Sequence, residues 1–195
     1  MFRPYPISFL QFALFWVIVA IGATALIRAF GGRQGGDAAK KSRLSTAGIA
    51  LQAIGFGCAG FGPVHFALPW WAPSSLICTA LVALLGGGAI GLFIAATRAM
   101  GRNWSVVART RSDHQLVRSG PFAVVRHPIY LALFLYLLSF ATAFGHFTQL
   151  LIAIPFYCAG LLIRIREEEK LLRAQFGEDH ARYVREVPAF IPFLR

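Results

Sequence analysis

Three long stretches of the chain contain no Lys, Arg, Asp or Glu. They cover residues 4–27, 44–97 and 127–163 and consist mainly of apolar side chains. A membrane-spanning helix needs about 20 consecutive apolar residues, so these stretches are long enough for one, two and two such helices. The pattern therefore predicts an all-α integral membrane protein with five transmembrane helices.

Glycine, proline and tryptophan divide the two longer stretches. In the first, glycines and prolines between 62 and 73 interrupt the apolar sequence beside the tryptophan pair 70–71. Pro and Gly end helices, and Trp is enriched at the membrane–water boundary. In the second, Gly145 marks a break that predicts a tight C-terminal helical hairpin. Pro155 is expected to bend the last helix without ending it.

The basic residues lie in alternate connections. Residues 28–43, residues 98–126 and the C-terminal segment carry most of the Lys and Arg, whereas the connections around Pro69 and Gly145 carry no charge. Positively charged connections remain on the cytoplasmic side of a membrane. This distribution predicts an N-terminus outside and a C-terminus in the cytoplasm.

Composition agrees with this class. Hydrophobic residues make up 57% of the chain and charged residues 14%, against about 25% charged residues in soluble domains. The net charge of +11 is explained by the basic connections and by attraction to anionic membrane lipids. A nucleic-acid partner is not expected, because it needs a soluble basic face. The first apolar stretch exceeds the core of a signal peptide, so we expect a retained first helix.

Several other patterns have a structural explanation. The glycines at 55, 57 and 60 match the dinucleotide-binding spacing, but no acid follows before Asp113. We therefore expect them, like the glycines at 86–91, to allow close packing of membrane helices. The three cysteines have no metal-binding or disulfide spacing. We expect His65 and His146 to be interfacial and His180 to be solvated.

Polar residues gather at the start of the hairpin. Arg126 and His127 precede Pro128, and Tyr130 follows. Pro at the first position of a helix has a suitable φ and loses no hydrogen bond, so Pro128 predicts a helix start. The positive end of that helix would attract a carboxylate or a phosphate.

A second polar group lies where the hairpin ends. Arg164 and Glu168 are four residues apart and share one helix face, and Glu168 is the middle of three successive glutamates. The hairpin brings this group to the membrane face that holds residues 126–130. Such a cluster predicts a site for a polar cofactor and a lipid-like substrate, because polar groups at membrane depth are costly and usually functional.

These motifs, in this order, resemble the isoprenylcysteine carboxyl methyltransferase family. The resemblance rests on His114–Val117, the Ser-Gly-Pro-Phe group ending at Phe122, residues 126–130, the Arg164/Glu168 pair and the Pro-containing tail. It covers about residues 100–195. Residues 1–98, which include the basic cytoplasmic loop 28–43, are expected to form the first three transmembrane helices. The core would comprise a cytoplasmic segment 99–127, the hairpin 128–166 and a C-terminal segment 167–195.

The resemblance implies S-adenosyl-L-methionine as methyl donor, bound in a cytoplasmic pocket. It implies Arg164 as the residue that holds a substrate carboxylate. The implied cofactor-binding residues are His114, Gln115, Leu116, Val117, Phe122, His127, Pro128, Ile129, Tyr130 and Glu168. Two departures stand out: Phe122 replaces the family's usual tyrosine, and a polar residue of the family has no clear counterpart around 107–109.

A carboxylate is already ionised at pH 7, so its methylation needs no base. Orientation and the replacement of water around the anion would then accelerate the reaction. The apolar part of such a substrate would enter from the bilayer.

Phospholipid amine and small thiol methyltransferases share the pattern but need a base, for example His127. A reductase-like relative and a non-catalytic membrane protein or transporter also fit parts of the pattern. The prenyl chain and the oligomeric state are not encoded in recognisable motifs.

Overall fold

The computed structural model describes residues 4–31, 43–101 and 116–190. Within these ranges the chain forms five α-helices, one 3-10 helix and no strand. The helices are α1 (Phe9–Gly31), α2 (Arg43–Gly60), α3 (Pro73–Met100), the 3-10 helix η2 (Gly120–Ala123), α4 (Pro128–Phe144) and α5 (Leu150–Glu186). The predicted all-α class is confirmed for this part of the chain.

Two of the helices are long and apolar enough to cross a membrane. They are α1, over Phe9–Ala29, and α3, over Pro73–Met100. The apolar helices over Leu44–Gly60 and Pro128–Phe144 are shorter. Large apolar side chains are exposed on α1 and α3, where contact with lipid is more favourable than contact with water. These features indicate a membrane protein, while five spans and their orientation stay predictions.

Local sequence signals set the bounds of α4. Pro128 occupies the first helical position, as predicted. The helix ends at Gly145, whose φ of 70° lies in the left-handed region that glycine adopts without strain. A side chain would also not fit there, because a Cβ at Gly145 would lie 2.2 Å from the carbonyl oxygen of Tyr5.

The last helix is longer than the apolar stretch that predicts it. Pro155 lies inside α5, which continues through it, so the expectation that proline does not end this helix is confirmed. The helix also continues beyond residue 166 to Gly177, where a φ of 48° changes the direction of the chain. A second helical part then runs to Glu186.

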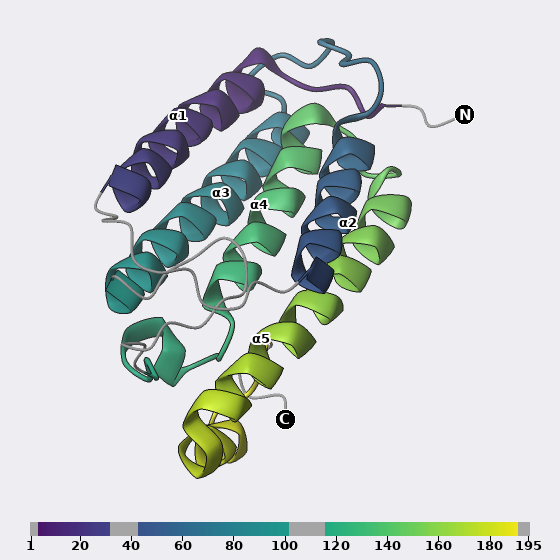
Figure 1. Ribbon diagram of the computed structural model, residues 1–195. Coiled ribbons are helices and arrows are strands. Elements are labelled where there is room, and N and C mark those ends of the chain that lie inside the picture. Colours follow the sequence, from purple (N-terminus) through teal and green to yellow (C-terminus); the bar gives the residue numbers. More distant parts are fainter. Residues whose placement is uncertain (1–3, 32–42, 102–115, 191–195) are drawn as a thin grey trace.

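The helices lie side by side, and α5 extends beyond the others (Figure 1). Although α4 and α5 are consecutive in the chain, each packs mainly against a different helix, α4 against α3 and α5 against α2. A buried cluster that includes Ala59, Leu137 and Tyr157 joins α2, α4 and α5.

The predicted outer segments meet at one end of the bundle, here called the N-terminal end. The Tyr5 amide donates to the Gly145 carbonyl at 2.8 Å, and the Ile7 amide donates to the His65 carbonyl at 2.8 Å. His146 lies here too, but it is fully buried rather than interfacial. Its Nδ1 is 2.9 Å from the Ala59 carbonyl oxygen, because the connection after α4 folds inward.

The glycine predictions are confirmed in part. A Cβ at Gly55 would lie 2.9 Å from the Ala153 carbonyl oxygen, and one at Gly86 would lie 2.8 Å from Ser139 Oγ. Gly60 likewise faces the ring of Phe140. The packing prediction is wrong for the remaining glycines, because nothing lies within 4 Å of a Cβ at Gly57, Gly87, Gly88 or Gly91. A glycine that faces away from the neighbouring helix takes no part in the contact between the two helices.

Candidate functional site

The start of α4 lies at the end of the bundle opposite the N-terminal end, here called the site end. His127 is the residue before the first helical position. The chain beyond α5 returns to this point, where the Arg126 amide donates to the Pro188 carbonyl at 2.9 Å. The His127 amide donates to the Ala189 carbonyl at 3.0 Å. Two segments more than 60 residues apart in sequence are thereby fastened together.

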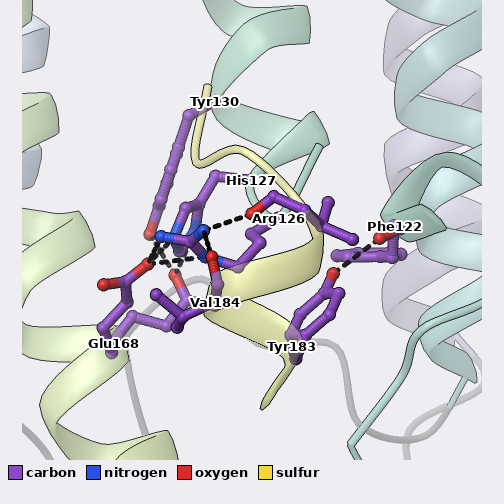
Figure 2. Close-up of polar contacts among 9 residues, drawn as sticks. Phe122, Arg126, His127, Tyr130, Glu168, Tyr183 and Val184 are labelled. Carbon is purple, nitrogen blue, oxygen red and sulfur yellow. Dashed lines mark hydrogen bonds and ion pairs between the residues drawn. The ribbon is translucent and has the colours of Figure 1, made fainter. Parts of the chain in front are cut away.

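Arg126 forms a partly buried ion pair with Glu169. Its Nε and Nη2 donate to Glu169 Oε1 at 2.9 and 2.6 Å. Its Nη1 donates to the carbonyl oxygens of Val184 and Val187, the first at 3.3 Å. Burial would raise the pKa of Glu169, but hydrogen bonds from His127 and Arg126 lower it to about 2. Arg126 therefore ties both parts of α5 to the start of α4 (Figure 2).

His127 lies between two carboxylates. Its Nε2 is 3.2 Å from Glu169 Oε1, and its Nδ1 is 3.6 Å from Glu168 Oε2. Burial alone would lower the pKa of His127, but the neighbouring carboxylates of Glu168 and Glu169 outweigh burial and raise it. The imidazole is therefore stabilised in its cationic form, in which both nitrogens donate.

Tyr130 connects His127 to the next polar residue. Its ring stacks on the His127 ring at a centroid distance of 5.6 Å. Its hydroxyl donates to Glu168 Oε2 at 2.8 Å (Figure 2). Burial would raise the pKa of Glu168, but His127, Tyr130 and Arg164 together lower it. Glu168 keeps 30% of its side chain exposed.

Arg164 is buried, with 7% of its surface exposed. Its guanidinium carbon lies 4.8 Å from the centroid of the Tyr130 ring, within cation–π range. Its Nη1 donates to Gln52 Oε1 at 3.0 Å.

Phe122 is also buried, on the other side of the Arg126 segment. Its carbonyl oxygen accepts a hydrogen bond from the Tyr183 hydroxyl at 2.7 Å (Figure 2). Burial raises the pKa of Tyr183 to about 12, so the hydroxyl remains a donor. Arg118 lies over the Tyr183 ring and pairs with Glu186. These contacts hold the second part of α5 against η2.

The structure brings together four of the predicted site residues, namely His127, Tyr130, Arg164 and Glu168. Pro128 and Ile129 form the first turn of α4. Leu116 and Val117 are half-buried. Of the remaining predicted residues, His114 and Gln115 lie outside the described ranges.

Sequence reasoning did not assign three further residues of this cluster. Glu169 follows Glu168 in the glutamate run, and only the rotation of α5 shows that both face His127. The expectation that His180 is solvated is wrong: it is fully buried beside Arg126 and Glu169, because the turn at Gly177 folds it inward. Gln52 lies in α2, where no motif marks it.

A comparison with known proteins shows which family the segment holding this cluster resembles. The sequence model of the isoprenylcysteine carboxyl methyltransferase family matches residues 79–174. Residues 79–174 of this chain are therefore similar to that family. The match includes His127, Tyr130, Arg164 and Glu168, and it leaves out α1 and α2.

Two curated relatives match parts of the chain. The protein-S-isoprenylcysteine O-methyltransferase of Schizosaccharomyces pombe is 33% identical over 89 residues, which are 46% of this chain and 38% of that protein. The cobalt-zinc-cadmium resistance protein CzcN of Cupriavidus metallidurans is 32% identical over 116 residues, 57% of this chain and 50% of that protein. The chain therefore spans half or less of the length of these relatives.

Proposed function

We propose that this protein is an integral membrane methyltransferase that uses S-adenosylmethionine to methylate the carboxylate of an isoprenylcysteine or a similar lipophilic compound. The similarity of residues 79–174 to the isoprenylcysteine carboxyl methyltransferase family supports the reaction class. The observation that carries the choice of a carboxylate is the buried Arg164, which lies beside ionisable groups that are poor bases.

Arg164 is suited to hold an anion at this depth. A guanidinium presents a planar set of N–H donors that matches a carboxylate. The Tyr130 ring and Gln52 fix its position. An arginine that is already ordered loses little conformational entropy when an anion binds, which favours binding in a single orientation.

The protonation states of the site favour an acceptor that needs no base. His127 has a raised pKa and Glu168 a lowered one. A cationic imidazole has no free lone pair, and a carboxylate with a low pKa is a weak proton acceptor. A phospholipid amine or a thiol must lose a proton during methylation, whereas a carboxylate is already ionised. This difference supports a carboxylate acceptor over those two.

The residues of the site fit S-adenosylmethionine chemically. Glu168 offers an anionic carboxylate on a partly exposed side chain for the ammonium group or ribose hydroxyls, and the start of α4 offers positive charge for the cofactor carboxylate. When bound, S-adenosylmethionine supplies an electrophilic methyl group: an O–C bond forms, the S–C bond breaks, and its electron pair remains on sulfur. We propose the ten residues named from the resemblance as its binding residues.

The apolar part of the acceptor would reach Arg164 from the bilayer. Arg164 follows the apolar first half of α5, whose residues Leu151 and Leu162 are exposed. In the proposed topology the N-terminus lies outside and the site end faces the cytoplasm, where the methyl donor is available. The charged and the apolar parts of the acceptor would then approach the site from different phases.

Calorimetric titration of the detergent-purified protein with S-adenosylhomocysteine tests the cofactor. We expect binding in the wild type and a loss of about tenfold or more in Glu168→Ala, since a hydrogen bond to a charged group contributes about 1.5–3 kcal/mol. Glu178→Ala, which removes an exposed carboxylate from the same helix, is the control and should bind normally. A folded wild type that does not bind would contradict the methyltransferase proposal.

Methyl transfer to N-acetyl-S-farnesylcysteine tests the acceptor. Arg164→Lys should keep binding of S-adenosylhomocysteine but lose most of its turnover, because lysine keeps the charge without the planar set of donors. Unchanged turnover in this variant would rule out the role of Arg164 as a carboxylate clamp.

A further inference from the structure

The polar environment of Arg164 includes a residue from the half of the chain that the family model does not match. Gln52 lies in α2, 112 residues from Arg164 in sequence, and the matched range begins at residue 79. Its side chain is buried, with 4% of the residue exposed. A buried amide in an apolar helix is costly unless its polar atoms are satisfied, so its presence calls for a physical explanation.

Two glycines bring this residue to Arg164. A Cβ at Gly48 would lie 2.6 Å from Arg164 Cγ, and a Cβ at Gly160 would lie 2.9 Å from Gln52 Cγ. Each long polar side chain therefore lies over the glycine of the facing helix. The two backbones are also close, because a Cβ at Gly160 would lie 2.5 Å from the Gly48 carbonyl oxygen. α2 and α5 are thus in close contact at the level of the site.

The contact with Arg164 determines the orientation of the amide. Arginine donates hydrogen bonds and accepts none, so the atom of Gln52 that faces Arg164 must be the oxygen. The amide nitrogen then points elsewhere, and Gln52 Nε2 is buried without a hydrogen-bond partner among the described residues. The Tyr157 hydroxyl is a neighbour, and its own proton is donated to the Tyr130 carbonyl at 2.6 Å. If the Tyr157 oxygen accepts one amide N–H, the other N–H of Nε2 still has no acceptor among the described residues.

We infer that Gln52 binds the carboxylate of the methyl acceptor together with Arg164. Its oxygen positions the guanidinium, and its Nε2 donates to the acceptor. This inference rests on the proposed function and adds a residue that selects the acceptor. An anion meets both a positive charge and an amide donor, whereas an ammonium group is repelled by Arg164 and offers Nε2 no acceptor. Binding one carboxylate oxygen in this way leaves the other free to attack the methyl group.

Two substitutions separate this role from a structural one. Gln52→Met keeps the length of the side chain and removes both polar atoms. Gln52→Glu replaces the donor by a carboxylate that would pair with Arg164 and compete with the acceptor. The control is Gln11→Met, which removes another buried glutamine, one that donates to the Thr142 carbonyl at the N-terminal end.

The measurement compares two probes, N-acetyl-S-farnesylcysteine and its methyl ester, which lacks the negative charge. We expect Gln52→Met to weaken binding of the acid about tenfold to a hundredfold, the effect of losing a hydrogen bond to a charged group. Binding of the ester and of S-adenosylhomocysteine should stay within about twofold. Gln52→Glu should lose more of the acid binding, and Gln11→Met should retain the preference of the wild type for the acid.

Three results would contradict this inference, each with a different consequence. An acid-to-ester preference that is unchanged in a folded Gln52→Met or Gln52→Glu variant would overturn this role, while wild-type turnover would preserve the proposed function. Failure of both variants to fold, with Gln11→Met folded, would assign Gln52 to bundle stability alone. A wild type that binds S-adenosylhomocysteine but shows no preference for the acid would overturn both the role of Gln52 and the choice of a carboxylate acceptor.

Discussion

At the scale of single residues, the surroundings of two buried histidines at the site end shift their pKa values in opposite directions. His127 has two carboxylates as neighbours, which raise its pKa. His180 is fully buried, and neither of its ring nitrogens has a hydrogen-bond partner within the described ranges. Burial lowers the pKa of His180, helped by the charges of Arg126, Arg173 and His127 and opposed only by Glu169. The surroundings therefore favour the neutral form of His180 and the cationic form of His127.

This difference predicts an acid-sensitive attachment of the second part of α5. When the folded-state pKa of a group is lowered, the unfolded state binds the proton more readily, so stability falls as pH drops below the ordinary histidine value of about 6.5. The melting temperature of the wild type should therefore decrease more between pH 7.5 and 5.5 than that of His180→Phe, measured in detergent. His127 changes the stability with pH in the opposite direction, but it is present in both proteins and does not account for a difference between them. Equal decreases would show that His180 is not the responsible group.

At the scale of the helices, glycine contacts decide which pairs of helices are neighbours. Gly48 and Gly160 allow α2 to approach α5, and Gly55 meets the backbone of α5 near Ala153. In lipid, close packing rather than the hydrophobic effect drives helix association, so small residues have a large effect. The packing of α2 on α5 places Gln52 beside Arg164.

Gly160→Ala is predicted to be destabilising despite the higher helix propensity of alanine. The added methyl group would overlap the Gly48 carbonyl oxygen, and such overpacking costs about 1–3 kcal/mol. We expect a lower melting temperature and weaker binding of the carboxylate probe, because α2 must move away from Arg164. Gly57→Ala is the control, since nothing lies within 4 Å of its Cβ. A Gly160→Ala protein as stable as this control would contradict the close contact.

At the scale of the whole molecule, the polar segments separate to opposite ends of the bundle. The N-terminal segment contacts the connections before α3 and before α5 at one end. The Arg126, His127 and Glu169 network lies at the other. This arrangement agrees with the charge distribution in the sequence, which predicts an odd number of spans with the site end in the cytoplasm.

Cysteine labelling tests that orientation. After replacement of the three native cysteines by alanine, Trp71→Cys on the connection before α3 and Glu178→Cys at the site end each introduce one exposed thiol. A membrane-impermeant maleimide should label Trp71→Cys in intact cells and Glu178→Cys only after permeabilisation. The reverse pattern would show that the topology is inverted. Labelling of both positions in intact cells would require an even number of spans between residues 71 and 178.

The sequence by itself determined the features that depend on neighbouring residues. Pro128 starts α4 and Gly145 ends it, as predicted, because helix ends are set by proline and glycine within one turn. Charge-free stretches predicted the helical class because apolar length is a local property. The order of the motifs also identified His127, Tyr130, Arg164 and Glu168, which the structure brings together.

Only the tertiary structure decided which side chains meet. Gln52 was not predicted, because its partner Arg164 is 112 residues away and the contact depends on which helices pack together. Glu169 and His180 were missed or misplaced because their surroundings depend on the rotation of α5 and on its turn at Gly177. Burial of a polar group is a property of the packed bundle, since its cost and its partners come from helices that are distant in sequence.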